Sequence, residues 1–161
     1  MTAFGDALLL HSTLVVDDFI KAIDGIPNDD LNTWKPSMTT EGEQVTNTFA
    51  GLAVHTAAVA EYLTFVAVGG QPDTRDRANE FTATTTFEEI STRLRTWIAN
   101  LKPFLDGLTD EQLAATSTYG SFAERGWTNA QVILHTLDHT ALHTGHAEIH
   151  RQLWEHERAG K

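Results

Sequence analysis

The sequence of 161 residues contains no cysteine. This absence excludes a disulfide scaffold, an iron–sulfur cluster, a cysteine-type zinc finger and a thiol nucleophile supplied by the protein itself. Basic residues are also few, with 11 Lys and Arg against 22 Asp and Glu, which gives a formal net charge of -11. Because binding to a phosphate backbone takes clustered basic side chains, we expect no nucleic-acid partner.

Long apolar runs are missing as well. The longest unbroken run has four residues, whereas about 20 are needed to cross a bilayer. The first ten residues carry no Lys or Arg ahead of their apolar positions, so they lack the charged region of a signal peptide. We therefore expect a soluble cytoplasmic protein without membrane contact. The length fits one domain, residues 1–161.

Apolar residues recur at helical spacing in four segments, and no segment alternates apolar and polar residues as a strand does. The expected helices run from Phe4 to a stop at Asp24-Gly25, from Thr48 to Val68, from a capping box at Thr86 to a bend or stop at Pro103, and from a capping box at Thr128 to about Arg158. The second is apolar on nearly every side and should be central. The pattern predicts an all-α four-helix bundle.

The connections between these helices, residues 26–45, 69–85 and 104–127, are long for a bundle. Such lengths permit a crossover between parallel neighbouring helices and leave residues to line the rim of a cleft. A short helical turn is expected at residues 108–113 within the last connection.

Five of the eight histidines lie on the last expected helix and share one face of it. At about 100° per residue they cover an arc of only about 80° beside the apolar face. Two imidazoles four residues apart can reach one metal ion, but the whole stripe is about 22 Å long, too long for one ion. The five are His135, His139, His143, His146 and His150.

A third ligand has to come from another helix, and His55 is the natural candidate. It lies in the least polar expected helix, where an imidazole needs a hydrogen bond or a metal to offset its desolvation. Three neutral imidazoles and a water make the open type of zinc site, although imidazole also suits Ni and Fe. Two alternatives stay open here: a hydrated histidine stripe, and a pH-sensitive interface whose imidazoles charge together.

Three stretches make the chain resemble the DinB/YfiT-like superfamily of metal-binding four-helix bundles. The first is Leu-Ala-Val-His-Thr-Ala-Ala-Val around His55, and the second is His-Thr-Ala-Leu-His-Thr-Gly-His at residues 139–146. The third, residues 31–36, is similar to the segment that follows the family's first helix. The likeness extends over nearly the whole chain.

The resemblance implies that His55, His139 and His143 hold a divalent metal, most readily Zn, with water completing the shell. Related enzymes use the metal to bind and ionise the thiol of a low-molecular-weight cofactor such as mycothiol or bacillithiol. They then transfer that thiol to an electrophile or use it in isomerisation. A homodimer is a further implication. Several members carry Gln where this chain has His146.

Other side chains are candidates for the surroundings of such a site. His146, one turn beyond His143, is a candidate hydrogen-bond partner or general base. Trp34 and Trp127 lie in or beside the long connections and are candidates to wall a pocket for a cofactor or substrate. Arg125 is a candidate to hold a substrate carboxylate by a bidentate contact.

Three hypotheses of different classes follow. The first is a metal-dependent enzyme, an S-transferase or a hydrolase, that activates a small thiol or water toward a small electrophilic substrate. The second is a metal-binding or stress-response protein without turnover. The third is a structural bundle whose histidine stripe forms a dimer interface.

Overall fold

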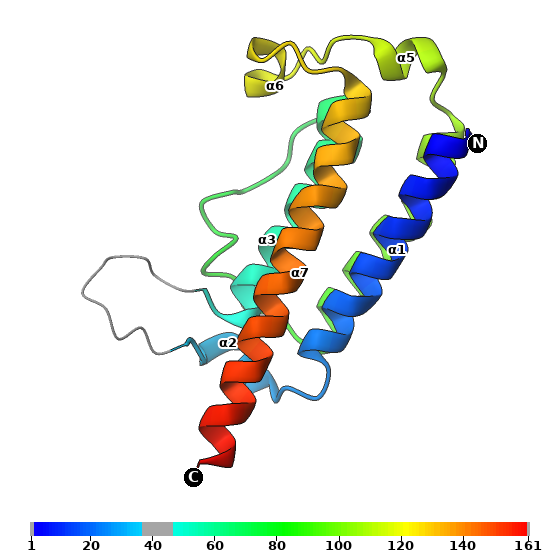
Figure 1. Ribbon diagram of the computed structural model, residues 1–161. Coiled ribbons are helices and arrows are strands. Elements are labelled where there is room, and N and C mark those ends of the chain that lie inside the picture. The colour runs from blue at the N-terminus through cyan, green and yellow to red at the C-terminus, as the bar shows by residue number, and fades with distance from the viewer. Residues whose placement is uncertain (1, 37–46, 161) are drawn as a thin grey trace.

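Four long helices make the bundle that the sequence predicts (Figure 1). The computed structural model describes residues 2–36 and 47–160, and within them it contains no strand. The long elements are α1 (Ala3–Ile23), α3 (Phe49–Glu61) with its continuation η1 (Tyr62–Val68), α4 (Phe87–Asp106) and α7 (Asn129–Ala159). The all-α prediction is therefore confirmed.

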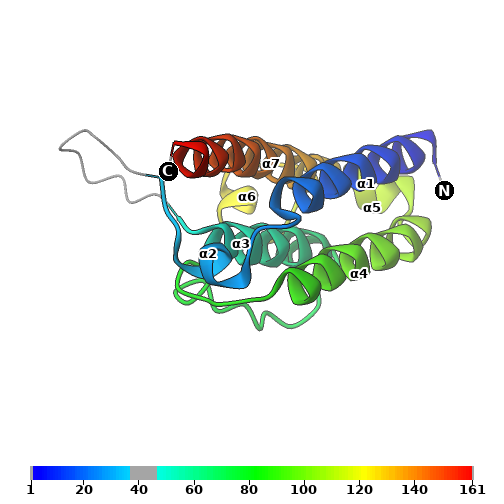
Figure 2. The same cartoon turned by 90° about the horizontal axis from the view of Figure 1, so that it is seen from below.

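The order of the helices around the bundle brings α3 beside α7. Helix α1 packs against α7 and α4, and α3 packs against the same two helices. Helices α1 and α7 run in one direction and α3 and α4 in the other, as the two views in Figures 1 and 2 agree. The segment from 69 to 86 thus crosses the length of the bundle to join two parallel neighbours, as its length led us to expect.

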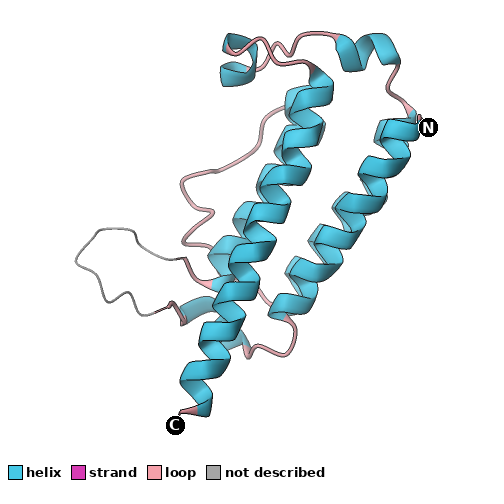
Figure 3. Ribbon diagram, viewed as in Figure 1, coloured by secondary structure: helices cyan, strands magenta, loops and turns pink. Residues whose placement is uncertain are grey.

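Three short helices lie in the connections (Figure 3). Helix α5 (Asp110–Ala114) matches the helical turn expected near residues 108–113, and Thr109 and Gln112 form a capping box at its start. Helices α2 (Asn28–Thr33) and α6 (Gly120–Glu124) were not expected, because five or six residues are too few to show a helical period. Residues 37–45 of the first expected connection lie outside the described residues.

Most of the capping and stop residues that the sequence places at the helix ends have the predicted effect. Both expected capping boxes form, at Thr86 and at Thr128. Helix α1 ends at Ile23, and Gly25 then adopts a φ of 72°, a left-handed conformation that glycine takes without steric cost. Pro103 does not stop α4, which continues to Asp106.

The second helix departs from the expectation over its last seven residues. We expected an α-helix to Val68, but Tyr62–Val68 is a π-helix. Its wider turns show in the N–H of Gly69, which bonds to the carbonyl of Thr64, five residues earlier, at 3.1 Å. Every side of this segment is mostly apolar, so the hydrophobic period cannot separate an α-turn from a π-turn.

Helix α3 and η1 together form the apolar centre of the bundle. The stretch Phe49–Val68 is long and apolar enough to span a membrane by length and composition alone. In the structure 67% of an apolar 18-residue window of that stretch is buried inside the protein, which is the environment of a core helix. Facing side chains complete the core; the largest fully buried ones include Trp97, Phe19, Phe49, Ile23, Leu31 and Leu94.

Truncation of a core leucine tests this packing. Leu94 is 0% exposed and Leu142 is 57% exposed, and both lie within long helices. Leu94→Ala should lower the free energy of unfolding by about 2–5 kcal/mol, because it removes buried methyl groups and leaves a cavity. Leu142→Ala, the matched control, should change it by less than about 1 kcal/mol. Equal losses in urea unfolding would contradict this assignment of the core.

Candidate metal centre

His55 lies on α3, at the side that faces α7. Its residue surface is only 8% exposed, and its ring centroid lies 4.5 Å from that of Phe81. The helix is fixed there by the apolar residues around it, so the imidazole is held in an environment with little water. Burial lowers the pKa of His55, although the hydrogen bond and charge of Glu80 oppose that shift.

His139 and His143 face His55 from α7. They are four residues apart, and their Nε2 atoms lie 3.2 Å from each other. The ring centroid of His55 is 5.2 Å from that of His139 and 5.0 Å from that of His143. The two rings therefore point into the bundle toward α3, which does not favour a histidine stripe exposed for a dimer interface.

The three imidazoles meet at one point. One ring nitrogen from each of His55, His139 and His143 lies within 4.8 Å of the other two. Two nitrogens bound to one tetrahedral zinc at the usual bond length are about 3.3 Å apart, close to the 3.2 Å between the two α7 rings. The structure thus brings together the three ligands predicted from the sequence.

Glu80, in the crossover segment, fixes the orientation of the His55 ring. Its Oε2 lies 2.7 Å from Nδ1 of His55, and the carboxylate is 4% exposed. A carboxylate at Nδ1 holds the proton on that nitrogen and leaves Nε2 as the atom that can bind a metal. Such carboxylate–histidine pairs are the usual outer support of metal-binding histidines. Sequence reasoning missed Glu80.

Arg75 in turn holds Glu80 from the other side. Its Nη2 donates to Oε2 of Glu80 at 2.8 Å, and its Nε donates to Oε1. Burial would raise the pKa of the Glu80 carboxyl, but the hydrogen bonds from Arg75 and His55 outweigh burial and lower it. Glu80 is therefore a carboxylate at neutral pH, and a chain of hydrogen bonds runs from Arg75 through Glu80 to His55.

Burial also keeps the two α7 imidazoles neutral. Desolvation, with the nearby imidazoles as a smaller contribution, lowers the pKa of His139 to about 4 and of His143 to about 3. Only the neutral ring has a lone pair for a metal. At pH 7 both rings are thus in the state that a ligand needs.

A divalent metal fits this donor set. The three rings are neutral or held in one tautomer, and their nitrogens have the spacing of a tetrahedral site. In addition, Nδ1 of His139 is buried and has no hydrogen-bond partner among the described residues. A buried polar atom without a partner is costly, so hydrogen bonding alone does not account for the placement of this ring.

The remaining histidines of the stripe lie outside the convergence. Nδ1 of His146 is 3.3 Å from Nδ1 of His143, so His146 can orient that imidazole. The ring of His135 packs edge-on against Trp127 at 5.4 Å. The ring of His150 packs against Phe49 at 5.6 Å, nearly two turns beyond His143 along the helix.

The two tryptophans predicted to wall a pocket and the arginine predicted to hold a substrate carboxylate are divided between two places. Trp34 stacks on Phe49 at 5.3 Å and donates from Nε1 to Glu157 at 2.9 Å, below the centre. The guanidinium of Arg125 lies 5.6 Å over the ring of Trp127, at the start of α7. The ring of His135 lies between Trp127 and the site: it contacts the ring of Trp127, and its centroid is 6.3 Å from that of His139.

The fold and this cluster define a helical-bundle protein with three convergent histidines of the metal-ligating type. The model of the DinB superfamily matches residues 13–147. The chain therefore belongs to the DinB superfamily, as its sequence motifs indicated. The matched range contains all three histidines of the cluster.

A solved structure supports the same fold. It is the crystal structure of a conserved protein from Enterococcus faecalis, which superposes with a TM-score of 0.71 at 16% sequence identity and covers 95% of this chain and 97% of that chain. At that identity the likeness shows the fold alone. No curated protein matches the chain at a significant level.

The lowered pKa values predict how the stability of the metal-free protein depends on pH. The unfolded chain binds protons at its histidines near pH 6.5, whereas His139 and His143 resist protonation until about pH 4 and pH 3. The contribution of these two neutral imidazoles to the free energy of unfolding should therefore be fully present above about pH 7. It should decrease as the pH drops below about 6.5, by about 1–2 kcal/mol per imidazole at pH 5.

Urea unfolding in a chelator at about pH 7.5 and about pH 5 measures this loss. The double variant His139→Gln and His143→Gln should lose less stability between these two pH values than the wild-type protein. An equal loss in both proteins would show that these imidazoles are not the groups responsible.

Removal of the Glu80 charge tests its role in orienting His55. Glu80→Gln should weaken the binding of Zn²⁺ by about 10- to 100-fold, because the amide no longer stabilises the positive charge that a metal draws onto the ring. Competition with a chromophoric chelator measures the affinity. Glu148→Gln removes an exposed carboxylate of α7 and should leave the affinity within about threefold; equal effects of the two variants would refute the orienting role.

Proposed function

We propose that this protein is a metal-dependent enzyme whose ion is held by His55, His139 and His143. One observation carries the proposal: three imidazole nitrogens from two helices lie within 4.8 Å of one another. The family and the histidine cluster both fit metal binding, and three protein ligands leave a further position for a small molecule. A divalent ion bound there would lower the pKa of a thiol or water at that position.

The chain's own residues prepare the centre in three ways. Glu80 holds the tautomer of His55, burial keeps His139 and His143 neutral, and His146 bonds to the far nitrogen of His143. The ligand rings are thus oriented before the metal binds, which reduces the entropy lost on binding. In this proposal His146 positions a ligand; the role of general base considered from the sequence would need its ring to leave His143.

Zinc is the metal that we propose first. Neutral imidazoles in a tetrahedral arrangement suit it, and nickel and iron also accept three imidazoles. The absence of cysteine means that a reaction through a thiol needs one from a small molecule. We accordingly propose that the protein transfers a low-molecular-weight thiol of the mycothiol type to a small electrophile. Hydrolysis, with water in place of the thiol, is the alternative reaction.

A metal-binding protein without turnover is the second candidate. The same three histidines support it, because a tightly held ion can serve storage or stability alone. Three expectations are the same for both candidates: a cytoplasmic location, a homodimer and the lack of a nucleic-acid partner. The two candidates differ in one measurable property, the rate of reaction of the metal-loaded protein.

Metal content tests the site directly. Untagged wild-type protein should bind about one divalent ion per chain, and His139→Gln should lose most of it, because two imidazoles bind far more weakly than three. His156→Gln is the matched control: it removes an exposed histidine of the same helix and should retain the ion. Elemental analysis after gel filtration measures the metal content of all three proteins. A retained ion in His139→Gln would contradict the proposed site.

Turnover then separates the enzyme from the binding protein. The zinc-loaded protein is assayed for consumption of several small thiols with a generic electrophile, and for hydrolysis of simple esters and amides. The expected result is a rate in at least one assay that His139→Gln lowers by at least about 100-fold. Rates equal to those of the metal-free protein in every assay would favour the binding role.

A further inference from the structure

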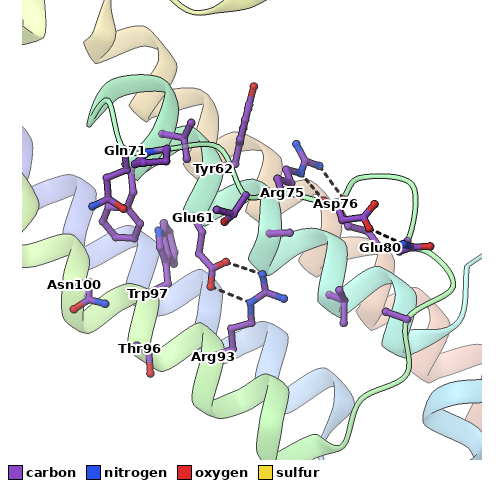
Figure 4. Close-up of a pocket in the computed structure, with 18 residues that line it drawn as sticks. Glu61, Tyr62, Gln71, Arg75, Asp76, Glu80, Arg93, Thr96, Trp97 and Asn100 are labelled. Carbon is purple, nitrogen blue, oxygen red and sulfur yellow. Dashed lines mark hydrogen bonds and ion pairs between the residues drawn. The ribbon is translucent and has the colours of Figure 1, made fainter.

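A cavity lies apart from the three histidines, between α3 with η1, the crossover segment and α4 (Figure 4). Its volume of about 510 Å³ falls in the range of sites for small molecules. None of the three clustered histidines lines it, although Arg75 and Glu80 form part of the wall between the two places. The cavity therefore offers room that the proposed metal chemistry does not use.

An ion pair stands in the middle of this cavity. Arg93 of α4 donates from Nε and Nη2 to the two carboxylate oxygens of Glu61, at 2.9 and 2.6 Å. The two side chains are 38% and 34% exposed, so the pair is open to a ligand. A guanidinium has five N–H groups, and those left over by Glu61 have no acceptor among the residues that the structure describes.

On one side of this pair lies a second group of charges. Figure 4 shows Arg75, Asp76 and Glu80 together there. Arg75 is committed to Glu80 by two hydrogen bonds, whereas Asp76 accepts only an amide hydrogen of Asn79, at 2.6 Å. This side consequently presents the exposed carboxylate of Asp76, which forms no ion pair within the part of the chain that the structure describes.

The other side of the pair is apolar with amide groups at its edge. Phe65 and Trp97 line it, and Figure 4 places Gln71 and Asn100 close to Trp97. Trp97 itself is buried, with only 2% of its surface exposed, and its indole N–H bonds to Thr64 at 3.3 Å, so the apolar surface that is open to a ligand here comes from the half-buried Phe65. The cavity is thus divided into a charged half and an apolar half.

The π-helix is an independent sign that this wall has a specific shape. Three of the lining residues, Tyr62, Phe65 and Val66, come from η1. Insertions of π-turns into helices are rare and are found mostly at functional sites. These η1 side chains line the cavity, and no residue of η1 belongs to the histidine cluster.

We propose that this cavity binds a small zwitterion with an apolar side group, of the α-amino acid class. The carboxylate of the ligand bonds to the remaining N–H groups of Arg93, and its ammonium group lies between Glu61 and Asp76. The apolar side group packs against Phe65, in the part of the cavity lined also by the buried Trp97. A simple anion would meet three carboxylates in this wall and a simple cation would leave Arg93 unused, so a ligand with both charges matches the site best.

The test uses metal-free protein, so that its result is independent of the proposed enzyme activity. The probe is L-phenylalanine, and the readout is the set of four indole N–H peaks in a nitrogen–proton NMR spectrum, assigned with Trp97→Phe. The Trp97 peak should shift saturably with a Kd on the order of 1 mM, a normal affinity for a ligand of this size. The peaks of the other three tryptophans, which do not line the cavity, should stay in place.

Two analogues and two variants define the charge requirement. Phenylalaninamide lacks the carboxylate and 3-phenylpropionate lacks the ammonium group, and each should bind at least about tenfold more weakly. Arg93→Gln should weaken the binding of L-phenylalanine by a similar factor. Arg95→Gln, at an exposed position of α4 outside the cavity, should leave this binding unchanged. No saturable shift of the Trp97 peak up to about 20 mM, or equal binding of all three compounds, would overturn the proposal.

Discussion

The hydrogen bond between Glu80 and Nδ1 of His55 is the interaction on which the candidate centre depends. Helix α3 is the most apolar helix of the bundle, and an imidazole inside it would be destabilising without a partner. Glu80 supplies that partner at 2.7 Å and in addition decides which nitrogen remains available. The side chain that makes the buried histidine tolerable thus also prepares it as a ligand.

The topology of the bundle explains why such a partner can reach His55. Helices α3 and α4 are parallel neighbours, so the chain has to return along the full length of the bundle between them (Figure 1). The returning segment passes so close to α3 that a Cβ on Gly51 would lie 3.0 Å from the carbonyl oxygen of Phe81. Glycine at this position permits the approach that brings Glu80 to the histidine.

The same segment connects two places with different chemistry. On one of its sides is the neutral, nitrogen-rich cluster of α3 and α7. On its other side is the charged cavity against α4, with Arg75 and Glu80 in the wall. Since Arg75 fixes Glu80 and Glu80 fixes His55, the crossover segment has a defined conformation at this point, although it contains no regular helix or strand.

Much of this arrangement could be predicted from the sequence, and the remainder depends on contacts that no local pattern records. The helices α1, α4 and α7 follow from periodic apolar residues and from the capping residues Thr86 and Thr128. The histidines of α7 were found because helical spacing aligns them, and His55 because a polar residue is conspicuous in an apolar helix.

Glu80 and Arg75 could not be found in this way. They lie in an irregular segment without periodicity, 25 and 20 positions beyond His55 in the sequence, and only the folded path of the chain brings them there. The π-turns of η1 were missed for a related reason: they result from packing around a segment that is apolar on every side. Trp34 and Trp127 were candidates to wall a pocket because they lie in or beside the long connections, and the structure places them at the two ends of the histidine stripe.

The central claim is that one ion is shared by His55, His139 and His143. Anomalous diffraction from crystals grown with stoichiometric zinc, recorded on both sides of the zinc absorption edge, tests it most directly. We expect a single strong peak about 2.0–2.1 Å from one nitrogen of each ring, with Nδ1 of His55 still bonded to Glu80. A peak at His135 or His150 instead, or no peak between α3 and α7, would contradict it.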